Sequence, residues 1–332
     1  MTPEEILAAI KKAAIATATG GQLTTEQAKA FIDLTVEQNK LLSKIQTVQM
    51  QSSTYQLNTI DIANRIMRKA VEGTDPGFIQ GVTITPRELS YIESIIPYDV
   101  TFSFLEENIE GQNAESKINQ MFAKSFGNNL IDLAINGDTS LAAAITDANA
   151  DGLDDTTGLS QNDHSFLIQN DGWLKIARND AGVHTYTLPA DLSTTTWKAI
   201  FKNVLKKMPS KWKGNPADLV LLVSPDVETE YRDELGERAT PMGDQYTVEN
   251  RMAQYQGINV EPIPFWPGID TVNYPVGPVV VLTKYQNLAA GIGRNMRVGR
   301  FVNERKRVVE YTITAKTDFN YVVSDLMVLA EK

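Results

Sequence analysis

Residues 110–138 read EGQNAESKINQMFAKSFGNNLIDLAINGD, a stretch that predicts one long helix at the centre of the fold. Its apolar side chains recur at helical spacing and fall within an arc of about 120°, the width of a buried helix face. These spine residues are Ile118, Phe122, Phe126, Leu130 and Leu133. The pattern predicts an amphipathic helix from Ala114 to Asn136 that is about 35 Å long, as long as a small domain is wide.

Both ends of this helix carry boundary signals. Asn113 is a residue type that caps helix N-termini, and Glu110 and Glu115 lie where the helix dipole favours negative charge. At the other end Gly137 is expected to adopt the left-handed conformation that terminates many helices. We therefore predict that the helix begins and ends within this stretch.

The composition excludes several classes of protein. A chain of 332 residues exceeds what one compact core organises, so two or more packed regions are expected. No apolar run is long enough to cross a bilayer, and the N-terminus lacks the basic-then-apolar order of a signal peptide, so we expect a soluble protein made in the cytosol. The absence of cysteine excludes disulfides and thiolate chemistry. With only His164 and His184, which we interpret as ordinary loop residues, the sequence offers no catalytic constellation and predicts no enzyme.

Residues 1–56 predict an extended helical arm. Helical spacing of apolar residues supports one helix over 3–18 and a second from Thr24 or Thr25 to Ile45, separated by a break at Gly20-Gly21. These stripes are too small for a separate core, so they are expected to pack on the main body or on another subunit. A frayed terminal helix pair is the alternative.

Residues 57–100 predict a long hairpin whose turn lies at Asp75-Pro76-Gly77. Two strands alone have no second layer to cover their apolar side chains, so the hairpin needs a surface beyond itself. That surface is either its own domain or another molecule.

After a loop-like segment over 139–182, residues 190–290 predict an α/β lobe. Expected helices span 192–208, 225–235 and 246–256, and expected strands span 218–224, 260–263 and 279–283. Residues 291–332 alternate repeatedly and predict long antiparallel strands that return to lie beside the spine helix. The basic residues among them fit a solvated strand face, or one that pairs with a neighbour, better than a nucleic-acid stripe, since no aromatic platform accompanies them. The formal net charge of −10 also argues against broad nucleic-acid binding.

A calcium-like loop occurs in the segment from 147 to 155. Its predicted ligands are Asp147, Asn149, Asp151, the carbonyl of Leu153, and Asp155, with Gly152 at the turn position. The twelfth position is Gly158, so the usual bidentate carboxylate is absent. Calcium binding and a solvated acidic turn both remain open.

Taken in order, several short stretches make the chain resemble the major capsid proteins of tailed bacteriophages, which share the Hong Kong 97 type fold. The carriers are NRIMRKAVEG (64–73), SFLEENIEG (103–111), INGD (135–138), NDGWLKIA (170–177), ERATPMGD (237–244), QGINVEPIP (256–264) and NLAAGIGRNMRV (287–298). The resemblance implies an α+β fold with an N-terminal arm (1–56), an extended loop (57–100), a spine helix with the first part of a peripheral domain (101–189), an axial domain (190–290) and C-terminal strands that complete the peripheral domain (291–332).

The same resemblance implies self-assembly of hexamers and pentamers into an icosahedral head around double-stranded DNA, without sequence-specific binding and without catalysis. It implies a scaffolding protein, a portal, a cement or decoration protein, and a place in the virion, with no membrane involved. It also assigns inter-subunit contacts to the extended loop, at Arg65, Arg68, Lys69, Asp75, Pro76 and Gly77. Fifty arm residues are too few for a cleaved scaffolding segment, so we expect a separate scaffolding protein or an uncleaved arm, and no covalent crosslink between subunits.

Two alternatives remain open from sequence alone. An encapsulin-like compartment would use the same fold without a virus. A calcium-binding extracellular adhesin or carbohydrate-binding module would also suit an acidic, cysteine-free, strand-rich chain.

Overall fold

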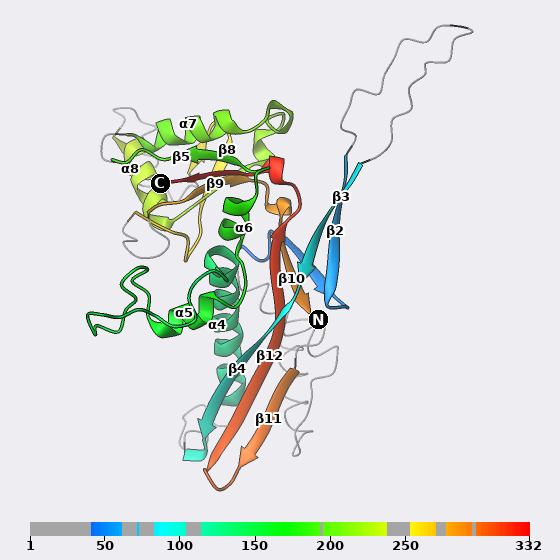
Figure 1. Cartoon of the computed structure of the whole chain (residues 1–332), viewed down its shortest axis with the longest axis vertical. Coiled ribbons are helices and arrows are strands. Elements are labelled where there is room, and N and C mark those ends of the chain that lie inside the picture. The colour runs from blue at the N-terminus through cyan, green and yellow to red at the C-terminus, as the bar shows by residue number, and fades with distance from the viewer. Residues whose placement is uncertain are drawn as a thin grey trace.

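The computed structural model describes residues 41–61, 72, 83–103, 114–192, 195–237, 253–269, 277–293 and 297–332. The described residues form a six-stranded sheet, a five-stranded sheet and a two-stranded hairpin. Figure 1 shows them in an elongated arrangement, with the six-stranded sheet at one end and the five-stranded sheet beside the helix α4 (Ala114–Asn136). The predicted helices within residues 1–40 lie outside the described residues. No helix in the described part of the chain is long and apolar enough to span a membrane.

The five-stranded sheet joins segments from both ends of the chain. Its order is β1-β10-β12-β11, and β4 also pairs with β12. The strands are β1 (Gln46–Met50), β4 (Ile92–Thr101), β10 (Leu288–Gly293), β11 (Arg297–Asn303) and β12 (Val308–Tyr321). Because β12 lies antiparallel to β4 over ten residue pairs, the C-terminal strands return to the first lobe.

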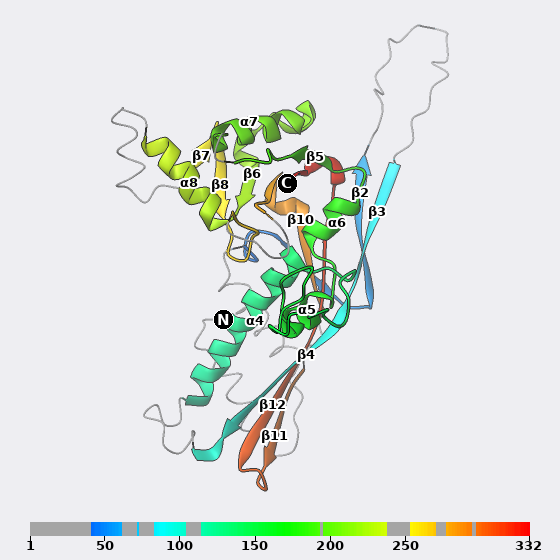
Figure 2. The same ribbon diagram turned by 60° about the vertical axis from the view of Figure 1, so that its left-hand side comes forward.

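The spine helix α4 runs from Ala114 to Asn136, as predicted. Phe126, Leu130 and Leu133 are buried in one core with residues of β10 and β12, and Phe122 is half-buried. Figures 1 and 2 show the helix lying along the sheet beside β4 and β12. The side chain of Ile118 lies outside the described residues, as does the predicted cap Asn113.

The end of α4 corrects one prediction. Gly137 does not have the left-handed backbone expected of it, since it is not among the residues with positive φ. A glycine is needed there for another reason: a Cβ at this position would lie 2.2 Å from the Asn170 carbonyl oxygen and 2.6 Å from that of Leu133. The Gly172 amide also donates to the Gly137 carbonyl at 2.8 Å. The helix therefore ends against the backbone of residues 170–172.

The segment over 139–182 is not all loop, and that prediction was wrong. It contains α5 (Gln161–Leu167) and α6 (Trp173–Asn179). A capping box starts α5, because the Ser160 side chain accepts from the Asp163 amide while the Asp163 carboxylate accepts from the Ser160 backbone. These helices of seven residues each pack close to α4, and α6 contributes the buried Trp173.

The six-stranded sheet has the order β5-β13-β9-β6-β8-β7. Its strands are β5 (His184–Thr187), β6 (Val220–Val223), β7 (Gln254–Tyr255), β8 (Ile258–Pro262), β9 (Val280–Thr283) and β13 (Val328–Glu331). The helices α7 (Trp197–Lys207) and α8 (Pro225–Gly236) share one apolar core with this sheet, and its other face packs toward α4 and α6. Short 3-10 turns lie at Ser210–Trp212, Pro216–Asp218, Tyr285–Asn287 and Ser324–Leu326.

Several predictions for this lobe are confirmed and two are not. The strand β6 is buried on both faces, and α8 begins at Pro225 as expected. By contrast, α7 begins at Trp197 with Thr196 as its cap, because the Thr196 side chain accepts from the Ala199 amide. The helix expected over 246–256 is described only in its last residues, where β7 forms instead.

The C-terminus also differs from the prediction. The strand β13 does not join β11 and β12 but inserts between β5 and β9 of the six-stranded sheet. The chain therefore crosses from one sheet to the other between Tyr321 and Val328. The six-stranded sheet therefore contains two strands, β5 and β13, that lie outside the predicted lobe over 190–290.

The long hairpin consists of β2 (Thr54–Asp61) and β3 (Thr83–Ser90), which pair with each other and form no larger sheet. It is shorter than predicted, because the chain enters the five-stranded sheet as β4 from Ile92 onward. On its other side, the predicted helix does not continue to Ile45. A turn over 41–44 leads into β1, and the side chains of Leu41, Leu42 and Ile45 are buried in the main core.

Candidate assembly surfaces

The β2–β3 hairpin has almost no apolar support of its own. Leu57 and Leu89 are buried at its base, together with Met50 and Ala289. Tyr55, on the same hairpin, is 42% exposed. Figure 1 shows the two strands leaving the body as an isolated ribbon. Since two strands alone are at best marginally stable, their remaining surface needs a partner.

One arginine fastens the base of this hairpin. Arg87 of β3 donates to the carboxylate of Asp180 and to the hydroxyl of Ser324, and its guanidinium carbon lies 4.3 Å from the centroid of the Tyr321 ring. Tyr321 donates its hydroxyl to the same Asp180 oxygen at 2.7 Å, and the Gly182 amide donates to the other oxygen at 2.8 Å. The hairpin anchor, defined as Arg87, Asp180, Tyr321 and Ser324, joins β3 to segments far away in sequence.

The hydrogen bonds of the hairpin anchor favour one protonation state. Burial opposes ionisation of Asp180, but the donors Tyr321, Gly182 and Arg87 outweigh it and hold the pKa of the carboxyl well below its usual range. Burial, followed by the hydrogen bond to Asp180, raises the pKa of Tyr321 above its usual value. Asp180 is therefore ionised and Tyr321 neutral at physiological pH, so the anchor contains one positive and one negative charge.

A stack of three rings fastens the spine helix to the sheet. Tyr98 of β4 stacks on Phe122 of α4 with ring centroids 3.7 Å apart, and on Tyr311 of β12 with centroids 4.8 Å apart. Aromatic stacking adds to the apolar burial of Phe126 next to it on the helix. The segments α4, β4 and β12 are thus held in a fixed arrangement.

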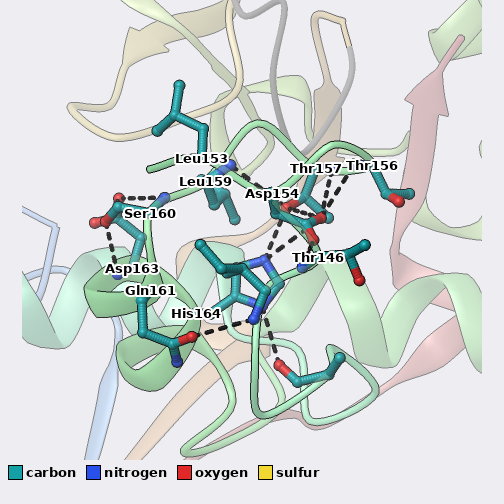
Figure 3. Close-up of polar contacts among 12 residues, drawn as sticks. Thr146, Leu153, Asp154, Thr156, Thr157, Leu159, Ser160, Gln161, Asp163 and His164 are labelled. Atoms are coloured by element: carbon teal, nitrogen blue, oxygen red, sulfur yellow. Dashed lines mark hydrogen bonds and ion pairs between the residues drawn. The ribbon is translucent and has the colours of Figure 1, made fainter. Parts of the chain in front are cut away.

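The third arrangement lies in the loop before α5 and was not predicted (Figure 3). His164 is buried, with Nδ1 3.0 Å from the carbonyl oxygen of Ala142 and Nε2 2.8 Å from Thr157 Oγ1. Thr157 Oγ1 in turn lies 2.8 Å from Asp154 Oδ2. The carbonyl only accepts, so Nδ1 carries a hydrogen. The Thr157 hydroxyl donates to Asp154, so the Thr157 side chain bridges His164 and Asp154.

Asp154 is the acceptor at the centre of this loop. The Thr146 amide donates to it at 2.8 Å, and the amides of Thr156 and Thr157 donate to its second oxygen. The Thr146 amide, the Thr157 hydroxyl and these further amides lower the pKa of Asp154 to about 2. An ionised Asp154 therefore closes the loop on itself and positions it against α5.

Sequence and fold are both similar to those of known capsid proteins. A curated relative, assigned as the prophage capsid protein YqbE of Bacillus subtilis (strain 168), is 26% identical over 307 residues, which cover 90% of this chain and 88% of that protein. The fold matches a chain of the satellite phage P4 procapsid, solved with its size determination (Sid) protein, with a TM-score of 0.63 and 14% identity over 92% of this chain and 98% of that chain. The chain has the Hong Kong 97 type capsid fold and is similar to a prophage capsid protein over most of its length.

An encapsulin shares the fold as well. The holo-SrpI encapsulin complex from Synechococcus elongatus PCC 7942 matches the chain with a TM-score of 0.51 and 12% identity, over 87% of this chain and 85% of that chain. No family model matches the sequence.

The predicted contact residues of the extended loop all lie outside the described residues: Arg65, Arg68, Lys69, Asp75, Pro76 and Gly77. Arg87, which lies at the base of the same hairpin, was not predicted. An arginine in a strand that reads TITPRELS gives no signal of its partners, because Asp180, Tyr321 and Ser324 are more than ninety positions away in sequence.

The carboxylates of the calcium-like loop are turned toward its own backbone. Asp147 accepts from the amides of Asp151 and Gly152, and Asp155 accepts from the amide of Ala148 and the side chain of Asn149. Within the described residues, which include this whole loop, no group of three or more His, Cys, Asp or Glu side chains is arranged to hold a metal ion. Calcium at Asp147, Asn149, Asp151, Leu153 and Asp155 stays a prediction.

Neither histidine of the chain is an ordinary loop residue. His164 lies on α5 and is fully buried, as described above. His184 begins β5, and its Nε2 lies 2.8 Å from Asp325 Oδ1. Both predictions were wrong, because isolated histidines in polar segments carry no information on tertiary partners.

Proposed function

We propose that this chain is the major capsid protein of a tailed phage or prophage, and that it catalyses no reaction. Its copies form hexamers and pentamers that tile an icosahedral head around double-stranded DNA, without sequence-specific binding. A separate scaffolding protein guides assembly, a portal occupies one vertex, and a cement or decoration protein binds the outer surface. Calcium, if it is needed at all, is a structural ion.

One observation carries this proposal. The β2–β3 hairpin is fastened at its base by Arg87 and a small apolar cluster, while the strands beyond the base form no larger sheet within the subunit. A ribbon of this kind is completed when it lies on another copy. Many such contacts, each weak, give a stable closed shell because they act together. The similarity to the prophage protein YqbE and to the P4 procapsid supports the same conclusion.

The cellular compartment is the second candidate, because the SrpI encapsulin shares the fold. The two functions differ in what the shell encloses. A phage shell encloses nuclease-protected DNA, and an encapsulin encloses a protein cargo.

Expression of the chain with the neighbouring genes of its source tests the proposal. Purified particles are examined by negative-stain microscopy, treated with nuclease, and analysed for DNA and protein content. Closed shells that protect DNA support the phage function. Shells that contain an enzyme and no DNA would instead establish the compartment, and a stable monomer in the presence of the scaffolding partner would reject both.

A further inference from the structure

The exposed face of α7 is unusually basic for this chain. Residues 197–213 contain six lysines and no acidic residue, although the whole protein carries a net charge of −10. Lys198, Lys202 and Lys206 are exposed and follow at intervals of four residues, so they form one row along the helix with steps of about 6 Å. Like charges at this spacing destabilise a helix slightly, and only Lys206, in the last turn, is favoured by the helix dipole.

The exposed face of α8 is acidic in a matching pattern. Four of its members follow at intervals of three or four residues and therefore share one face: Asp226, Glu230, Asp233 and Glu237. The half-buried Glu234 adjoins them at the next position after Asp233. Carboxylates of this acidic row line a hollow of about 300 Å³ between α8 and the start of α7. The sixth acid, Glu228, belongs to a different face, where it is buried and pairs with Arg232.

The two rows do not neutralise each other within one subunit. Glu234 accepts from the backbone amides of Trp197 and Lys198, and Glu230 accepts from the indole of Trp197. In the part of the chain that the structure describes, no ion pair joins an α7 lysine to an α8 acid. The lysine row and the acidic row are therefore two complementary surfaces of one chain, with the same helical pitch.

We propose that the lysine row of α7 in one subunit packs on the acidic row of α8 in the next subunit of the same ring. This inference rests on the proposed assembly function and names the surfaces that join neighbours. A contact between two different faces of identical chains is head-to-tail, and such contacts close into rings. Each exposed ion pair contributes little, but the rows fix the register and exclude wrong orientations.

DNA is a less suitable occupant of the lysine row. The helices α7 and α8 lie side by side, with Phe201 and Tyr231 in edge contact at 4.9 Å between ring centroids. A nucleic-acid backbone laid along α7 would therefore run beside five carboxylates, whose charge repels phosphate. A second copy of the chain can instead place its acidic row on the α7 lysines and its lysine row on the α8 acids, so that opposite charges meet at each contact.

Charge reversal in both rows tests the proposal. The variant K202E/K206E leaves two glutamates and one lysine in the lysine row. The variant D233K/E237K places two lysines in the acidic row, in which Glu230 and Glu234 already accept hydrogen bonds from Trp197 and only Asp226 remains without that contact. Neither pair includes a residue whose side chain is buried. We expect each double variant to fold with an unchanged melting temperature and to lower the yield of shells about tenfold or more, since like charges then face each other. The fourfold variant, in which both rows are exchanged, is expected to recover shells. The control K124E/K332E makes the same change in net charge as K202E/K206E, at exposed positions elsewhere.

A mixture of the two double variants gives a sharper result. Alternating subunits restore opposite charge at every contact in a six-membered ring but not in a five-membered one, which cannot alternate. We therefore expect sheets or tubes from the mixture, and no closed icosahedral shells.

The outcomes separate this inference from the proposed function. If the unaltered chain does not assemble, the function itself fails. If the chain assembles and the double variants do so equally well, the α7–α8 contact is refuted. If K202E/K206E assembles normally but no longer retains DNA, the lysine row binds nucleic acid and the contact is also refuted.

Discussion

Replacement of Arg87 by alanine should loosen the extended hairpin without unfolding the body. The change removes charge-assisted hydrogen bonds to Asp180 and Ser324 and the contact with the Tyr321 ring. Asp180 keeps the Tyr321 hydroxyl and the Gly182 amide as donors, so it is not left without partners. A hydrogen bond to a charged group contributes about 1.5–3 kcal/mol, and both side chains are about one-fifth exposed, so we expect a loss of about 2–4 kcal/mol.

Apolar contacts at the base also hold the hairpin on the body. Leu57 and Leu89 are the buried apolar side chains of its two strands, and burial of each contributes about 1.5–3 kcal/mol. The anchor therefore supplies a share comparable to the apolar contacts. Its removal should leave the hairpin docked but opening far more often.

Hydrogen exchange of the backbone amides measures this opening directly. Amides of β2 and β3 should exchange about 30- to 1000-fold faster in R87A, whereas amides of α7 should be unchanged. The matched control is Glu88→Ala, since Glu88 is exposed and contributes only its backbone carbonyl to Asn320. Arg87→Lys should fall between the two, because it keeps the charge but not the planar fork. Unchanged exchange in β2 and β3 of R87A would refute the anchor, and equal acceleration in α7 would show that Arg87 stabilises the whole fold instead.

Three further predictions concern other parts of the chain. Phe126→Asp should unfold the subunit and abolish assembly, because removal of this buried ring alone costs about 3–5 kcal/mol of folding free energy. The control Met121→Asp, at a 71% exposed position of α4, should remain folded by circular dichroism, and a soluble, folded F126D protein would contradict the packing of α4. The loop around Asp154 should lose stability as pH falls from about 4, the pKa of an unfolded aspartate, toward about 2, the pKa of Asp154 in the folded protein. In urea titrations between these pH values D154N should lack this dependence, and an unchanged dependence would show that ionised Asp154 does not stabilise the loop. If the loop over 147–155 binds calcium, the ion should raise the melting temperature of the unaltered protein but not that of D147N/D151N. Equal melting temperatures of the unaltered protein with calcium and with a chelator would reject the site.

The spine helix could be predicted from sequence because its evidence is local. Three of its buried residues, Phe126, Leu130 and Leu133, repeat at helical spacing, and Gly137 marks the end. Even there the physical reason differed, since Gly137 is required by the approach of another backbone segment and not by its own conformation. The sequence pattern predicted where α4 ends, but the reason for a glycine there is the close approach of the Asn170 backbone.

Other elements could not be predicted, because their structure depends on distant partners. The apolar spacing of Leu41, Leu42 and Ile45 is compatible with both a helix and a turn. Residues 46–50 pair with β10 as a strand, so the chain before them forms a turn and not the end of a helix. A four-residue segment such as β13 carries no signal that distinguishes one sheet from the other. The hairpin anchor and the His164 network join residues that only the fold brings together.

Assembly itself is the claim to test most directly. Purified chain, expressed with its scaffolding partner, should be examined by cryo-electron microscopy at high protein concentration. We predict closed shells with five-fold and six-fold rings, in which each β2–β3 hairpin lies across a neighbouring subunit and the axial helices α7 and α8 face each other across the ring contacts. A monodisperse monomer under these conditions, or particles in which the hairpin folds back on its own subunit, would contradict the account.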